Sequence, residues 1–508
     1  MAGSSAQPNI LLVMADQLAP QFTGAYEHPV VRTPTMDALV ERGVRFDTAY
    51  CPYPLCAPSR YSMLTGQPAT AIGAWDNGSE LPASVPTLAH YLRLAGYRTT
   101  LSGKMHFVGP DQLHGFNERL TTDVYPADFA WTANWDEAAD RMGKWWHNMT
   151  SLSEAGQALA TYQIDYDEDV GSAAVRHLYD MARDTDDRPF FLTVSFIHPH
   201  DPYVARPEWW NLYDHDEIDL PDVPPVASLD PHTVRIRHGI EIDTVGYTED
   251  QCRNARRAYY ANTTYVDSWL GTLVRVLEET GQLDNTVVIF TSDHGDMLGD
   301  RGVWFKMSFF ERSARVPLIM AGPDITNGTV PNACSLLDML PTLLDITGGG
   351  TWPDLAEAPA GRSLWESATG GCDPVDETTS EYTGVMTSHP MFMIRRGRHK
   401  YIHCDTDPAQ LYDVEGDPLE RNNLAEDPDH ADLASGFAAE VTERWDSDAI
   451  REQVLASQRA RRVVHAAMEV GDLHSWDFSP STDATNQYIR NHMDWADAGP
   501  RTRYPPVV

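Results

Sequence analysis

The sequence predicts an α/β fold, with a large and mostly parallel sheet flanked by helices. Short apolar runs alternate with helical patterns along the first two thirds of the chain, which is the pattern of strand–helix–strand units. The runs are continuous and bounded by polar residues, as is typical of parallel strands buried on both faces. We expect these strands at 9–15, 97–102, 190–196, 286–291 and 317–321.

A long helix is predicted between the third and fourth of these strands. Thr248 and Gln251 have the spacing of a capping box, which marks a helix start. Apolar residues then recur at helical spacing until Gly281, which is expected to end the helix. The repeating residues are Val266, Leu270, Leu273 and Leu277.

The character of the chain changes after residue 349. Glycine, proline and acidic residues crowd 348–376, which predicts a loop or linker. The segments 391–395 and 400–404 flank a turn and predict a hairpin in a small antiparallel subdomain. We therefore expect a large α/β domain over 1–375, a small C-terminal α+β subdomain over 376–450, and an extended tail over 451–508. The tail has no evident core of its own, and we expect it to contact a neighbouring subunit of a homo-oligomer, a dimer or a tetramer.

Composition restricts the classes of partner. The 508 residues carry 74 acidic and 38 basic side chains, a net charge of −36, which argues against nucleic-acid binding. A solvated acidic surface explains this charge, and attraction of a cationic substrate is the alternative. No apolar run approaches the roughly 18 residues of a membrane span, so no membrane partner is expected. The six cysteines include no C-x-x-C pair, and no secretory leader is recognisable, so we expect a cytoplasmic protein.

Acidic residues follow two of the predicted strands. Asp16 comes after the first strand, and Asp293 and His294 come after the fourth. Open α/β sheets form their sites at the carboxyl ends of strands, so these side chains are candidates for a functional site. The alternative for an isolated Asp in such a place is a helix N-cap.

The most specific motif is Cys56-Ala-Pro-Ser-Arg60, followed by Leu64-Thr-Gly66. A buried cysteine beside a proline turn is the structural alternative. The motif resembles the signature of type I sulfatases, in the alkaline phosphatase superfamily. The resemblance implies an alkaline phosphatase-like fold and oxidation of Cys56 to formylglycine by a formylglycine-generating enzyme. The hydrated aldehyde would attack sulfur in a sulfate ester and form a covalent sulfo-enzyme intermediate.

The same resemblance implies the other site residues. The expected ligands of one divalent ion, Ca²⁺ or Mn²⁺, are Asp16, the modified Cys56, Asp293 and His294, with Gln17 as a weaker candidate. The expected catalytic residues are Cys56, Arg60, Lys104, His106, His200 and Lys306. Solvated surface lysines are the alternative for Lys104 and Lys306, but the chain has only four lysines. His114 and His198 are expected to be structural.

Longer stretches resemble the choline sulfatases, including 101–116, 120–129, 198–206 and 490–493. The resemblance implies substrate contacts from Asp76, Asn77, Trp131 and His147, with Trp146 beside the last. Aromatic faces and carboxylates suit a quaternary ammonium group, whereas core packing is the alternative for each tryptophan. Val385 and Ala496 stand where relatives carry acids near that group, which leaves the choice of alcohol open.

Three functions therefore compete. The first is hydrolysis of a sulfate monoester, preferably choline-O-sulfate, with another alkyl sulfate as a variant. The second is hydrolysis of a phosphonate or phosphate ester, because the Asp16/Gln17/Asp293/His294 pattern is shared with such enzymes. The third is a non-catalytic protein that binds sulfated or cationic ligands. This last alternative predicts an unmodified Cys56 and no turnover.

Overall fold

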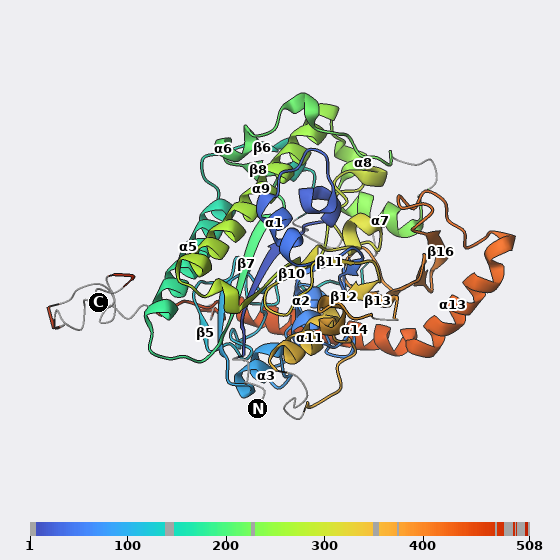
Figure 1. Cartoon of the computed structure of the whole chain (residues 1–508). Helices are drawn as coiled ribbons and strands as arrows, with labels where there is room; N and C mark the ends of the chain where they lie inside the picture. The colour runs from blue at the N-terminus through green and yellow to red at the C-terminus, as the bar shows by residue number, and fades with distance from the viewer. Residues whose placement is uncertain are drawn as a thin grey trace.

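The computed structural model describes residues 7–137, 147–224, 229–348, 355–372, 375–472, 475–481, 491–492, 494 and 503–505. Its centre is an eight-stranded sheet in the order β11-β2-β10-β9-β1-β7-β4-β5 (Figure 1). The five predicted strands are confirmed, and four of them, β9, β1, β7 and β4, are adjacent and parallel. β10 runs antiparallel to both of its neighbours. The strands are β1 Asn9–Asp16, β2 Val44–Phe46, β4 Arg98–Gly103, β5 Glu118–Arg119, β7 Phe190–Pro199, β9 Thr286–Ser292, β10 Leu318–Ala321 and β11 Gly328–Val330.

Helices cover this sheet. α5 (Tyr162–Arg183) and α9 (Glu249–Glu279) pack on β7 and on each other, whereas α3 (Leu88–Leu94) packs on β4 and on α11 (Met339–Ile346). In Figure 1, α5 and α9 lie along the left and upper parts of the molecule, and α3 and α11 lie at the bottom. The predicted long helix is α9, and Thr248 and Gln251 form the expected capping box.

The predicted hairpin is also confirmed. β14 (Met391–Arg396) and β15 (His399–Cys404) pair across a turn at Gly397, which has a left-handed φ of 55°. With β13 (Glu377–Tyr382) and β16 (Asp407–Asp413) they form a four-stranded antiparallel sheet. Side chains alternate between its faces. Met391 and Met393 join the main core, whereas Phe392 and Ile394 join a second core with Phe437 of α13 (Ala431–Arg444).

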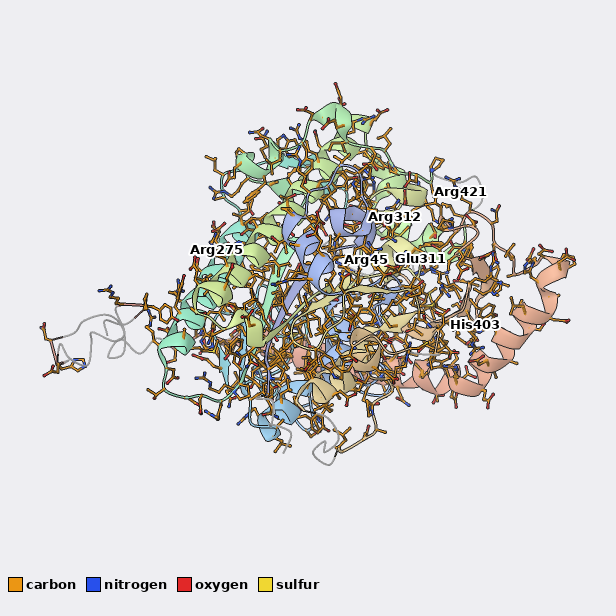
Figure 2. The ribbon with its side chains drawn as sticks, in the orientation of Figure 1. Arg45, Arg275, Glu311, Arg312, His403 and Arg421 are labelled. Atoms are coloured by element: carbon orange, nitrogen blue, oxygen red, sulfur yellow. The ribbon has the colours of Figure 1, made fainter. Side chains whose placement is uncertain are left out.

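A buried charge cluster fixes this small sheet to helix α10 (Glu311–Ala314). Lys400 of β15 donates to Glu311 Oε1 at 2.9 Å and lies 2.5 Å from Glu420. Tyr50 donates to the same Glu311 oxygen at 2.7 Å. Figure 2 shows Glu311 near Arg312 and Arg45 in the middle of the molecule, and His403 of β15 toward α13. The small sheet and the large domain therefore share polar as well as apolar contacts.

α14 (Ser447–Met468) lies against the large domain and crosses the predicted boundary between residues 450 and 451. Val454 packs on Trp75 and Trp135. Beyond the helix, Asp477 accepts a hydrogen bond from the Ala127 amide at 2.9 Å. Residues 473–474, 482–490, 493, 495–502 and 506–508 of the predicted tail, which include Ala496 and two residues of the 490–493 stretch, lie outside the described residues.

The remaining elements are short or peripheral. Among the described residues, no helix is both long and apolar enough to cross a membrane. The further helices are α1 Pro34–Arg42, α2 Cys56–Thr65, α4 Thr150–Ser153, α6 Pro207–Trp210, α7 Pro231–Gly239, α8 Ile242–Val245, α10 Glu311–Ala314 and α12 Trp365–Ala368, and the further strands are β3 Ala49–Tyr50, β6 Gly156–Gln157, β8 Val204–Ala205 and β12 Cys334–Ser335.

Candidate active site

Four neighbouring strands deliver the predicted polar residues to one edge of the sheet. Asp16 is the last residue of β1, Lys104 follows β4, His200 follows β7, and Asp293 follows β9. Because these strands are parallel and adjacent, their carboxyl ends coincide. All four side chains are buried.

Cys56 begins helix α2, which points its N-terminus at this edge. Its Sγ lies 3.2 Å from His294 Nε2 and 3.9 Å from Asp16 Oδ1. The thiol stands where the oxygens of a hydrated formylglycine would be. Asn77 fixes the start of the helix, because its Oδ1 accepts a hydrogen bond from the Ala57 amide at 3.0 Å. The free amides of a helix N-terminus also favour an anion there.

Asp16, Cys56, Asp293 and His294 each offer one ligand atom, and these atoms lie within 4.8 Å of one another. His294 Nδ1 donates a hydrogen bond to the Gly295 carbonyl oxygen at 3.0 Å. The proton is therefore on Nδ1, and Nε2 has its lone pair available for a metal. Nε2 lies 3.7 Å from Asp293 Oδ1 and 4.0 Å from Asp16 Oδ1. Ligands bound to Ca²⁺ at about 2.3–2.6 Å are separated by similar distances, so this oxygen-rich set with one imidazole fits a divalent ion.

Two cations hold the carboxylates in place from the other side. Arg60 donates from Nε to Asp293 Oδ2 at 2.7 Å and from Nη2 to Asp16 Oδ2 at 3.0 Å. Lys104 also donates to Asp16 Oδ2. Burial alone would raise the pKa of Asp16, but Lys104, His200 and Arg60 together hold it well below its usual value. Asp16 is therefore ionised, with its Oδ1 directed at the ligand set.

His106 lies beside the nucleophile as a neutral base. Its backbone has a left-handed φ of 62°, and its amide donates to Asp123 Oδ2 at 2.9 Å. Burial lowers the pKa of the ring, and the neighbouring Cys56 offsets this only in part. Among the described residues, neither ring nitrogen has a hydrogen-bond partner. A buried, unprotonated imidazole next to Cys56 can accept a proton.

His200 and Lys306 form a second proton-handling pair. His200 donates from Nδ1 to the Asp201 carbonyl at 2.6 Å, so its Nε2 accepts a hydrogen bond from Lys306 Nζ at 2.8 Å. Burial and the Lys306 ammonium hold the pKa of His200 well below its usual value. Lys306 also donates to Gln17 Oε1. The side-chain oxygen of Gln17, a weaker candidate for the metal, thus accepts a hydrogen bond from Lys306, and its Nε2 donates to Asp296 at 2.7 Å.

Asp76 is the predicted substrate residue that the structure does not bring to the cavity. Both of its carboxylate oxygens bind Arg461 of α14, at 2.5 and 3.0 Å, and it is 1% exposed. It also accepts a hydrogen bond from the Ala133 amide at 3.2 Å. Asp76 thus fastens α14 and the segment before Trp135 to the loop that carries Asn77.

A cavity of about 520 Å³ opens onto Cys56. Asn77, Trp131 and His147 line it, as predicted, and His200 lies at its inner end. Tyr125 also lines it, with its ring 4.6 Å from that of Trp131 and 4.3 Å from Lys104 Nζ. Trp146 lies outside the described residues.

Sequence reasoning missed Tyr125 and Asp201. Asp201 lies 3.0 Å from His147 Nδ1 and within 3.3 Å of Gln17 Nε2. Its place directly after His200 was the available signal, whereas nothing local marks Tyr125. His198 is structural as expected, because its Nδ1 pairs with buried Asp167 at 2.7 Å. His114 packs on Phe107 with ring centroids 4.4 Å apart.

Known families match nearly the whole chain. The family model described as Sulfatase matches residues 8–349, and the one described as Choline sulfatase enzyme C terminal matches 452–504. A third, N-sulphoglucosamine sulphohydrolase, C-terminal, matches 299–446. The chain is 44% identical to a choline-sulfatase of Rhizobium meliloti (strain 1021) over 99% of each chain. It is 29% identical to an arylsulfatase of Clostridium perfringens, over 80% of this chain and 89% of the relative.

Solved structures support the fold class. A phosphonate monoester hydrolase of Agrobacterium radiobacter superposes with a TM-score of 0.69 at 25% identity, over 88% of this chain and 96% of the other. A 2-O GAG sulfatase superposes with a TM-score of 0.67 at 24% identity, over 86% and 92%. The predicted α/β architecture with its additional antiparallel sheet is confirmed. From the extent of these matches, the chain belongs to the sulfatase family and, within it, groups with the choline sulfatases.

Proposed function

We propose that this protein hydrolyses choline-O-sulfate to choline and sulfate, with a formylglycine made from Cys56 as nucleophile. The observation that carries the proposal is the meeting of Cys56, Asp16, Asp293 and His294 at the floor of a cavity with an aromatic wall. The 44% identity to a relative named choline-sulfatase supports the choice of alcohol. Val385, where relatives carry an acid, is buried and is not among the described residues that line this cavity.

The residues divide the reaction into two steps. In the first, one hydroxyl of the hydrated aldehyde gives its proton to water in the cavity, and its oxygen forms a bond to sulfur as the bond from sulfur to the choline oxygen breaks. Lys306, with His200 beside it, supplies the proton that the departing alkoxide needs. In the second, His106 takes the proton of the remaining hydroxyl, the bond from carbon to the sulfated oxygen breaks, and the aldehyde re-forms as sulfate leaves. Water then restores the hydrate.

The remaining side chains position the reacting groups and neutralise the negative charge of the sulfate. Arg60 and Lys104 hold Asp16 and, near the transferring group, would offset the charge of its oxygens. A divalent ion bound by Asp16, Asp293, His294 and the modified residue 56 would polarise the sulfate. We assign this ion as Ca²⁺, with Mn²⁺ as the alternative, because carboxylate oxygens dominate the set.

Assembly and location are part of the same proposal. We propose a homo-oligomer in which the expected subunit contact lies beyond α14, because α14 itself packs on the large domain of its own chain. We also propose a cytoplasmic location, which agrees with six free cysteines. Light scattering of the purified protein and fractionation of its host test these two points.

The decisive experiment measures sulfate release from choline-O-sulfate by protein produced with a formylglycine-generating enzyme. A peptide mass for the Cys56 segment reports the modification independently. Turnover should follow the modified fraction. Modified protein that does not hydrolyse choline-O-sulfate would disprove the proposal.

Hydrolysis of a phosphonate ester is the second candidate. The similarity in structure to a phosphonate monoester hydrolase favours it, whereas the pair Gln17 and His294 is compatible with both functions. The ratio of kcat/KM for choline-O-sulfate to that for phenyl phosphonate esters separates the two functions. We expect the sulfate ester to be preferred by at least about a hundredfold, which is about 2.7 kcal/mol of transition-state binding.

A further inference from the structure

We propose that Asp296 is a positioning residue, which holds the ammonium of Lys306 in the direction that the leaving group needs. It acts at two points. It fixes the side chain of Gln17, which accepts a hydrogen bond from Lys306, and it fixes the backbone just before Lys306. This inference rests on the proposed function and adds the residue on which the direction of Lys306 depends. Asp296 is not one of the four side chains that meet around Cys56.

Asp296 is fully buried, and both of its carboxylate oxygens accept hydrogen bonds. Oδ1 accepts from the backbone amides of Leu298 at 2.8 Å and Phe305 at 2.9 Å. Oδ2 accepts from Gln17 Nε2 at 2.7 Å and from the Tyr203 hydroxyl at 2.8 Å. All four partners are donors, so the site needs an acceptor oxygen on each side. A carboxylate supplies both oxygens, whereas an asparagine side chain would place an NH2 group at one of them.

The Oδ2 side determines which way the Gln17 amide faces. Gln17 Nε2 donates to two carboxylates, to Asp296 Oδ2 at 2.7 Å and to Asp201 Oδ1 at 3.3 Å. An amide oxygen in that place would face negative charge, so the oxygen takes the other side, where it accepts from Lys306. The acceptor that Lys306 meets on Gln17 therefore depends on the carboxylate of Asp296.

The Oδ1 side fixes the loop that leads to Lys306. This loop closes on itself, because the Met297 amide donates to the Phe305 carbonyl at 2.6 Å while Asp296 Oδ1 accepts the Phe305 amide. Phe305 and Met307, on either side of Lys306, have left-handed φ values of 69° and 74°. Bulky residues keep this conformation only where the surrounding contacts impose it. Asp296 supplies one of those contacts directly before Lys306.

Lys306 has two fixed acceptors, and one of them depends on Asp296. Its Nζ donates to Gln17 Oε1 and to His200 Nε2, the latter at 2.8 Å. An ammonium has three N–H groups, so these two contacts set the direction of the third. If the Gln17 oxygen turned away, the ammonium could rotate and its third proton would lose alignment with the departing oxygen. This misalignment slows the reaction only where the leaving group needs the proton.

The experiment compares esters whose leaving groups differ in their need for a proton. In Asp296→Asn we expect kcat/KM to fall roughly thirtyfold for choline-O-sulfate, about tenfold for phenyl sulfate and about threefold or less for p-nitrophenyl sulfate. Asp267→Asn is the matched control, since Asp267 is also buried and accepts two backbone amides, those of Thr35 and Met36, outside the cavity. It should leave the ratios among the three esters unchanged.

A double variant tests whether Asp296 acts through Lys306. The rate of Lys306→Met/Asp296→Asn on choline-O-sulfate should lie within about twofold of that of Lys306→Met alone, because the group that Asp296 positions is gone. Gln17→Leu removes the acceptor from Lys306 and leaves Asp296 in place. It should repeat the loss that is selective for poor leaving groups, and it tests the same contact if Asp296→Asn does not fold.

Metal analysis separates this role from an effect on the metal site. Asp296 lies two residues after His294, so a displaced backbone could disturb the ligand set. We expect Asp296→Asn to hold as much divalent metal as the unaltered protein. A loss of metal that matches the loss of activity would assign the effect to the ligand set and overturn the inference.

The outcomes also separate this inference from the proposed function. Equal losses on the three esters, or losses that multiply in the double variant, would refute the role of Asp296 and leave the function standing. If the unaltered, modified enzyme does not hydrolyse choline-O-sulfate, the proposed function fails. The comparison of phenyl sulfate with p-nitrophenyl sulfate then still decides the role of Asp296.

Discussion

Around Asp16, each carboxylate oxygen has a separate role. Oδ2 accepts hydrogen bonds from Lys104 and Arg60, whereas Oδ1 faces Cys56 and His294. Asp293 Oδ2 also accepts a hydrogen bond from Arg60, whereas its Oδ1 accepts the amides of Gln17 and His294. The fixed cations on Oδ2 of Asp16 keep that acid ionised in a buried site, where an unpaired carboxylate would otherwise take up a proton.

Cys56→Ala tests the nucleophile. The substitution removes the group that is to become the aldehyde, so turnover of choline-O-sulfate should fall by about 10⁴-fold or more. The melting temperature should stay within a few degrees, because the thiol adds little to the core. Activity near that of the unaltered enzyme would remove Cys56 from the mechanism.

Lys306→Met tests the leaving-group role. Choline is a poor leaving group and needs a proton, so its ester should lose about 10²–10³-fold in kcat. p-Nitrophenyl sulfate releases a stable anion and should lose roughly tenfold or less. Equal losses on the two esters would assign Lys306 to sulfate binding instead.

At the scale of elements, α14 braces the loop that sets the start of α2. Arg461 donates hydrogen bonds to both oxygens of Asp76, and the neighbouring Asn77 accepts a hydrogen bond from the Ala57 amide. Arg461→Met would leave a buried carboxylate unpaired, which costs about 3–5 kcal/mol in comparable pairs.

We therefore expect Arg461→Met to lower both the melting temperature and kcat/KM, the latter by roughly tenfold through misplacement of Cys56. Arg459→Gln is the control, since Arg459 lies on the same helix and pairs with Asp136 at the surface. Equal changes in melting temperature and in kcat/KM for the two variants would show that the contact with Asp76 does not position Cys56.

The Lys400 cluster joins the small antiparallel sheet to helix α10. Burial would raise the pKa of Glu311, but Lys400 and Arg315 lower it to about 2, whereas the pKa of Glu420 is raised, mainly by burial. A carboxyl whose pKa is lower in the folded state stabilises the fold above its unfolded value of 4.5. This contribution is lost as the pH falls from about 4.5 toward 2.

Lys400→Met removes the cation that Glu311 and Glu420 share. We expect a loss of about 3–5 kcal/mol in the free energy of unfolding at pH 7 and a smaller loss near pH 3, measured by denaturant titration. Arg398→Met breaks an exposed pair with Asp413 and should change stability little. A loss independent of pH would contradict the assigned charge of Glu311.

For the whole molecule, the net charge of −36 creates self-repulsion that salt screens. Between 0.01 and 0.5 M NaCl the screening length falls from about 30 Å to less than 8 Å. The melting temperature should therefore rise by several degrees over this range. Sucrose at matched osmolality controls for solvent effects, and an equal rise in sucrose would exclude screening as the cause.

The parts predictable from sequence were those with local signals. Strand ends located Asp16 and Asp293, and the capping box located α9, because periodicity and caps are properties of neighbouring residues. The pairing of Asp76 with Arg461 could not be predicted, since the two residues are 385 positions apart and no local pattern marks the pair. The place of Tyr125 in the cavity wall likewise depends on which loops meet there, which only the assembled fold decides.

The depth of Cys56 sets an order of events in the life of the chain. Its side chain is 1% exposed, and the strands that surround it include β1 and β9, which are more than 260 residues apart in sequence. Under the proposed function, an enzyme that oxidises Cys56 needs access to a segment that is buried throughout in the finished helix α2. We therefore expect the oxidation to precede closure of the sheet, and protein that folds first to stay unmodified and inactive.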